Sequence, residues 1–168
     1  MKRAWIVLCL SISISMTAAC RMADGPLPDP KADEAPNQLG DLGRDVSGVV
    51  AGDTQARQDF MDDLMAFVDL EQTPNAEGPV KALGTQVLDA AVATKPTEAA
   101  VAPLLEHLYV AIKARQLSEG QVKTLEGDVL AAASRMGLDD VKARALASQA
   151  VIVQQAVTDR HRRWYEVF

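Results

Sequence analysis

Beyond residue 52, apolar side chains recur every three or four positions, and no stretch of useful length alternates apolar and polar residues as a half-buried strand does. The core must be aliphatic, because aromatic residues make up only 4% of the chain. The spacing predicts an all-α fold, a single helical bundle of about five amphipathic helices over residues 53–168. The expected core residues are Phe60, Leu64, Phe67, Val68, Val80, Leu83, Val87, Leu88, Ala91, Val101, Leu104, Leu105, Leu108, Ile112, Val122, Leu125, Val129, Ala132, Met136, Leu146, Ala150, Val153 and Val157.

Capping residues, prolines and glycines mark the expected ends of these helices. Asp53 or the threonine after it can cap the first helix, and Pro79 suits the first position of the second. Pro103 should either begin the third helix or kink it. Gly137 is expected to close the fourth helix in a left-handed conformation, and Asp139 to cap the fifth.

The chain begins with the pattern of a secretory signal. A positive Met-Lys-Arg is followed by an apolar run over residues 4–16, diluted only by serines. At about 1.5 Å per residue this run is too short to cross a hydrocarbon core of about 30 Å as a permanent helix. We therefore expect residues 1–19 to be a signal peptide.

The end of that segment, Thr17-Ala18-Ala19-Cys20, resembles the lipobox of bacterial lipoproteins, with threonine where an aliphatic residue is usual. The resemblance implies that Cys20 receives a lipid and becomes the first residue of the mature chain. Arg21 is not the aspartate that retains such proteins in the inner membrane, so the implied place is the bacterial cell envelope, lipid-anchored to the outer membrane and facing the periplasm. The alternatives are an ordinary cleaved signal peptide or a retained membrane helix.

Residues 20–52 differ in composition from the rest of the chain. Four prolines fall between positions 26 and 36, and four glycines between positions 40 and 52. Proline lacks the backbone donor that helices need, and glycine destabilises a helix interior. The segment is predicted to be a disordered, acidic Pro/Gly-rich tether, with the apolar residues of 39–52 lying against the domain rather than forming a stable helix.

Charge and chemistry exclude several functions. The net charge of −6 argues against nucleic-acid binding, which requires a basic surface. His107 follows a glutamate but lacks the second histidine of a zinc helix, and His161 is isolated, so no metal is predicted. No nucleophile elbow and no cysteine–histidine haem motif is present. The expected protein is not an enzyme and carries no cofactor.

Residues 117–121 read Leu-Ser-Glu-Gly-Gln. This run resembles the L-T-x-x-Q motif of the Spy-like periplasmic chaperones, with serine in place of threonine. The resemblance implies an alternative function as a periplasmic chaperone or as an envelope-stress or metal-responsive protein. The local interpretation is a capping box, in which Ser118 and Gln121 close the start of a helix after the leucine.

The C-terminal residues are basic and aromatic: Arg160, His161, Arg162, Arg163, Trp164 and Tyr165. Such a cluster either packs back on the bundle, complementing a helix dipole, or forms a contact surface, because Arg, Trp and Tyr are enriched at binding hot spots. We expect a non-enzymatic envelope lipoprotein whose periplasmic bundle binds a protein partner. An assembly or pilotin-like role, in which a partner's helix lies in a groove between helices, is the leading hypothesis.

Overall fold

The computed structural model describes residues 25–29, 35–114 and 116–158. This part of the chain forms six α-helices and one turn of 3-10 helix, and it contains no strand. The predicted all-α helical bundle is therefore confirmed, with one helix more than expected. The elements are α1 (Ala35–Ala51), α2 (Thr54–Ala66), η2 (Pro74–Ala76), α3 (Glu77–Thr94), α4 (Glu98–Lys113), α5 (Glu119–Arg135) and α6 (Asp140–Thr158).

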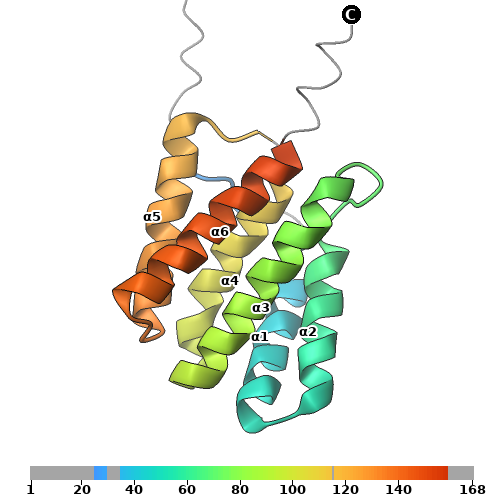
Figure 1. Ribbon diagram of the computed structural model, residues 1–168, viewed down its shortest axis with the longest axis vertical. Helices are drawn as coiled ribbons and strands as arrows, with labels where there is room; N and C mark the ends of the chain where they lie inside the picture. The colour runs from blue at the N-terminus through green and yellow to red at the C-terminus, as the bar shows by residue number, and fades with distance from the viewer. Residues whose placement is uncertain (1–24, 30–34, 115, 159–168) are drawn as a thin grey trace, which may run out of the picture.

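The helices pack in two layers around a common core (Figure 1). In the nearer layer α6 lies between α5 and α3, and α4 and α1 lie behind them. Helix α6 contacts α5, α3 and α4, while α4 also contacts α5 and α1. Helix α2 packs against α1 and α3 at the opposite side from α5. Helices α4, α5 and α6 therefore form a mutually packed triangle.

The spacing predicted the core well. Every expected core residue is buried except Val122, which is half-buried. The Asp53 side chain accepts a hydrogen bond from the Gln55 amide at the start of α2. Gly137 has φ near +90° after α5, and Asp139 accepts a 2.9 Å hydrogen bond from the Lys142 amide at the start of α6. Local capping and tertiary burial agree at these helix ends.

The prediction of a tether as far as residue 52 is wrong, because Ala35–Ala51 is helix α1 and buries Leu42, Val46 and Val49 in the core. One of its glycines serves close packing. A Cβ on Gly48 would lie 2.7 Å from the Cβ of Ala56 in α2, so only glycine allows this approach. The propensity cost of about 1 kcal/mol per glycine is offset by tertiary burial, which supplies most helix stability in proteins.

Pro79 differs from expectation, and Pro103 takes one of its two expected places. Pro79 is not the first residue of α3, because the 3-10 turn leads directly into a helix that begins at Glu77. It still lies in the first turn, where backbone N–H groups have no intrahelical partner. Pro103 lies inside α4 rather than at its start. Its missing N–H removes one helical bond to the carbonyl of Ala99, four residues before it.

Candidate functional site

The outer face of α6 carries an exposed stripe of four residues, in which Val141, Ala145 and Ile152 are apolar and Ser148 is small and polar. Their spacing of four, three and four places them along one side of the helix. All four are exposed, Val141 by 77% and Ile152 by 47%. Because its inner face is buried in the core as well, α6 carries apolar side chains on two sides. We call these four residues the α6 stripe.

Beside the α6 stripe, a hollow of about 400 Å³ opens between the second half of α3 and the first half of α6. Small side chains form most of its apolar wall, and Ala145 belongs to both the hollow and the stripe. Because alanines leave the helix backbones close to the surface, another helix can approach closely here. The lining residues are Gln86, Asp89, Ala90, Ala93, Leu138, Lys142, Ala145 and Leu146.

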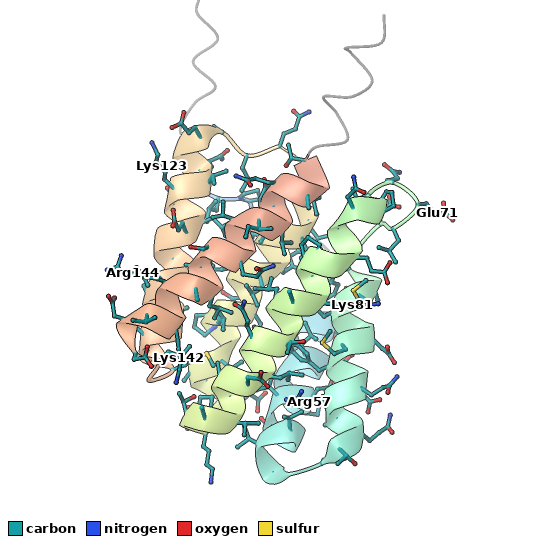
Figure 2. The ribbon with its side chains drawn as sticks, viewed as in Figure 1. Arg57, Glu71, Lys81, Lys123, Lys142 and Arg144 are labelled. Carbon is teal, nitrogen blue, oxygen red and sulfur yellow. The ribbon has the colours of Figure 1, made fainter. Side chains whose placement is uncertain are left out.

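Two of the charged side chains that line this hollow already form ion pairs. Asp89 accepts a 2.9 Å bond from Arg57 on α2, and the Lys142 ammonium lies 3.4 Å from Asp139 (Figure 2). The Oε1 atom of Gln86 is buried and has no hydrogen-bond partner among the described residues. A buried acceptor without a donor costs about 1–3 kcal/mol.

A second groove, between α4 and α5, is occupied by the chain itself. Residues 25–29 run along it, seen as the short blue segment in Figure 1, and Leu27 packs against the core. The side-chain Nε2 of Gln121 lies 3.3 Å from the carbonyl oxygen of Gly25 and 3.2 Å from that of Pro26. The space of about 390 Å³ is lined on the helix side by Glu106, His107, Val110, Thr124 and Asp128.

The motif at residues 117–121 forms the predicted capping box at the start of α5. The Ser118 hydroxyl accepts a 3.2 Å hydrogen bond from the backbone N–H of Gln121. The side-chain oxygen of Gln121 accepts a 3.0 Å hydrogen bond from the backbone N–H of Ser118. Leu117 is half-buried against the core. Gln121 thus uses its oxygen for the cap and its nitrogen for the segment in the α4/α5 groove.

Carboxylates gather where α1 meets α2. Burial raises the pKa of Asp45, and the nearby Asp63, Asp59 and Asp41 raise this pKa further, while Arg44 lowers it. Burial and neighbouring aspartates also raise the pKa of Asp63. Within the described ranges, no group of three His, Cys, Asp or Glu residues is arranged to hold a metal ion. The cluster is therefore an electrostatic feature of the α1–α2 contact.

The sequence-predicted site residues lie outside the described ranges. They are Cys20 and the C-terminal Arg160, Arg162, Arg163, Trp164 and Tyr165. Sequence reasoning missed the α6 stripe as a surface, although the four-three-four spacing of its small and apolar residues was a readable signal. It also missed the α4/α5 groove, which brings together residues almost a hundred positions apart and leaves no local pattern.

Comparison with protein-family models, with curated proteins and with solved structures finds no match to this chain. In the part of the chain that the structure describes, no helix is both long enough and apolar enough to span a membrane. The molecule is thus defined by its fold, an all-α bundle, and by two surfaces: the α6 stripe with the hollow beside it, and a groove on α4 and α5.

Proposed function

We propose that this protein is a non-enzymatic bacterial envelope lipoprotein whose bundle binds an amphipathic helix of a protein partner on the α6 stripe. The observation that carries the proposal is the stripe itself. A helix already packed on its inner face has no structural need for valine and isoleucine on its outer face. Exposed apolar side chains gathered on one surface are typical of interaction sites.

The stripe has the geometry of a helix-packing seam. Spacings of four and three repeat in seams where the side chains of one helix insert between those of another. Ala145 and Ser148 in the middle are small enough to allow close approach of the backbones, and Val141 and Ile152 at the ends provide larger contacts. The neighbouring hollow would receive a bulky partner side chain. This arrangement supports the helix-in-groove mode expected of an assembly or pilotin-like factor.

The location rests on the N-terminal sequence. A lipid on Cys20 would hold the bundle at the membrane, facing the periplasm, where the partner is an envelope protein. The basic and aromatic residues after α6 follow the same helix that carries the stripe, so they would extend the contact beyond Thr158.

Site-specific photocrosslinking in the native cells tests the proposed partner surface. A photoreactive residue at Ser148, on the stripe, should give one discrete adduct with an envelope protein. The matched control is Ala131, another exposed small residue, which lies on α5 outside the stripe. Ile152→Glu should reduce the Ser148 adduct at least tenfold without changing helical circular dichroism, because Ile152 is outside the core. A ladder of many adducts at both positions would favour the chaperone alternative instead.

Mass spectrometry of the N-terminal peptide tests the anchor separately. An acylated Cys20 at the first position, together with release of a Cys20→Ser variant from the membrane fraction, is the expected result. An unmodified Cys20 would overturn the lipoprotein assignment while leaving the partner surface open to its own test.

A further inference from the structure

We propose that residues 25–29 form a strap that docks in the α4/α5 groove, shortens the tether from Cys20 to the bundle, and turns the α6 stripe away from the membrane. The inference deepens the proposed function and rests on it for the lipid anchor. The docked contacts themselves are independent of that anchor. They include two hydrogen bonds from the Gln121 side chain and the packing of Leu27 against the core.

The strap has the chemistry of an internal ligand. Pro26 and Pro28 have fixed φ angles, so the segment loses little conformational freedom when it docks. Proline has no N–H group, and the segment therefore presents mainly carbonyl acceptors to the groove. The side-chain Nε2 of Gln121 donates to two of these, and Leu27 packs against the core and lines the same space as Val110.

Docking changes the length of the tether. Cys20 precedes Gly25 by five residues and α1, which begins at Ala35, by fifteen. Fully extended, five residues span at most about 17 Å and fifteen at most about 50 Å. With the strap docked, the α4/α5 groove must therefore lie within about 17 Å of the residue that carries the lipid.

The position of the groove then sets which side of the bundle faces the membrane. Helices α4, α5 and α6 pack against one another, so α6 covers one side of the α4–α5 pair and the strap lies on the other. In Figure 1 the strap passes behind, and α6 lies in front. A short anchor at the strap therefore leaves the outer face of α6, with its stripe, directed away from the bilayer and accessible to a partner.

The first experiment measures docking without lipid or partner. In the chain from residue 20 onward, Cys20 is the sole native cysteine, and Glu126→Cys adds a second spin-label site on α5. Double electron–electron resonance should give distances that stay below about 35 Å, from the 17 Å reach, the one to two turns of α5 between Gln121 and Glu126, and the length of the labels. Gln121→Glu keeps the capping box, since glutamate also accepts at that position, but replaces the strap's donor by a carboxylate.

Gln121→Glu and Leu27→Ser should each broaden this distribution and extend it beyond about 35 Å. The matched controls are Gln155→Glu on the exposed side of α6 and Leu70→Ser in the α2–α3 loop, which should leave it unchanged. Distances extending beyond about 35 Å in the parent protein, or distributions in both strap variants identical to that of the parent, would overturn the strap. Because no acyl chain or partner is present, neither result depends on the proposed function.

The second experiment tests orientation. The same chain is coupled through Cys20 to maleimide lipids in phosphatidylcholine vesicles that carry nitroxide headgroups. A fluorescent residue at Gly127, which has open space around it on α5, should be quenched several-fold more than one at Ser148 on the stripe. Gln121→Glu should remove the difference. Equal quenching at both sites in the parent protein would contradict the orientation.

Discussion

The helical hairpins at the two ends of the bundle, α1–α2 and α5–α6, differ in how the sequence specifies them. In the α5–α6 pair, local signals mark the boundaries: a capping box at Ser118, a left-handed Gly137 and a capping aspartate before α6. The α1–α2 pair has glycines within α1 and a cluster of carboxylates at its interface. Both pairs turn through a left-handed glycine and a capping aspartate, Gly52 with Asp53 in one and Gly137 with Asp139 in the other. They differ in that α5 begins with its own capping box, whereas α1 depends on its contacts with α2.

The α1–α2 contact depends on close approach. Gly48 faces Ala56, and α1 buries Leu42, Val46 and Val49 in the core. A helix interior with several glycines is intrinsically poor, so α1 gains its stability from this burial. The α5–α6 pair also has ion pairs four residues apart, such as Lys123 with Glu119, but these are exposed to solvent and stabilise the helices little.

The largest effect should come from filling the α1–α2 contact. Gly48→Ala places a Cβ 2.7 Å from the Ala56 Cβ, which is attached directly to backbone and cannot rotate away. The helices must separate, and overpacking of this kind typically costs about 1–3 kcal/mol. We expect the free energy of unfolding, measured by urea denaturation, to fall by about that amount.

Gly40→Ala is the matched control in the same helix, because an added Cβ there meets nothing within 4 Å. It should stabilise the protein by about 0.5–1 kcal/mol through helix propensity alone. Opposite signs for the two alanines would establish that α1 is held by its contact with α2. Stabilisation by both would show that the contact is looser than described and would remove the distinction between the hairpins.

The same difference explains what the sequence could predict. Helices α2 to α6 carry caps, breaks and three-four spacing that agree with one another, so all but one of the core residues expected in them are buried. Several buried alanines, with Tyr109 and Val110, were not predicted. Helix α1 combines good apolar spacing with glycines that are unfavourable in isolation, and only the position of Ala56 explains Gly48. The docking of residues 25–29 could not be predicted either. Gln121 lies far from them in the sequence, and its role in the capping box is enough to explain why a glutamine stands there.

A smaller effect is expected from the local signal in the other hairpin. Ser118→Ala removes the hydroxyl that accepts from the Gln121 amide, and losing an N-cap costs about 0.5–2 kcal/mol. Ser134→Ala is the control in the same helix, since its hydroxyl only bonds back to the Leu130 carbonyl within the helix. In thermal unfolding, Ser118→Ala should therefore have a lower midpoint temperature than Ser134→Ala. Equal stability would mean that α5 does not depend on its cap, and the α5–α6 hairpin would then not be specified locally.

The smallest effect tests the electrostatics of the α1–α2 contact. Burial, followed by the neighbouring Asp63 and Asp59, raises the pKa of Asp45 above its ordinary value. The folded state therefore binds this proton more tightly than the unfolded state does. The resulting contribution to stability is fully present below the unfolded pKa of about 3.8 and is lost as the pH rises through the raised folded pKa.

Asp45→Asn removes this titration and leaves a neutral side chain of the same shape. The variant should be more stable than the parent at pH 7, and the difference in the free energy of unfolding should shrink as the pH falls through the raised pKa of Asp45 in the folded parent. Glu71→Gln, in the exposed α2–α3 loop, removes the same charge away from the cluster and should show no such pH dependence (Figure 2). Urea denaturation at the two pH values measures both variants. A constant difference between Asp45→Asn and the parent would mean that the carboxylates at this contact are fully hydrated, and that the α1–α2 pair differs from α5–α6 in packing alone.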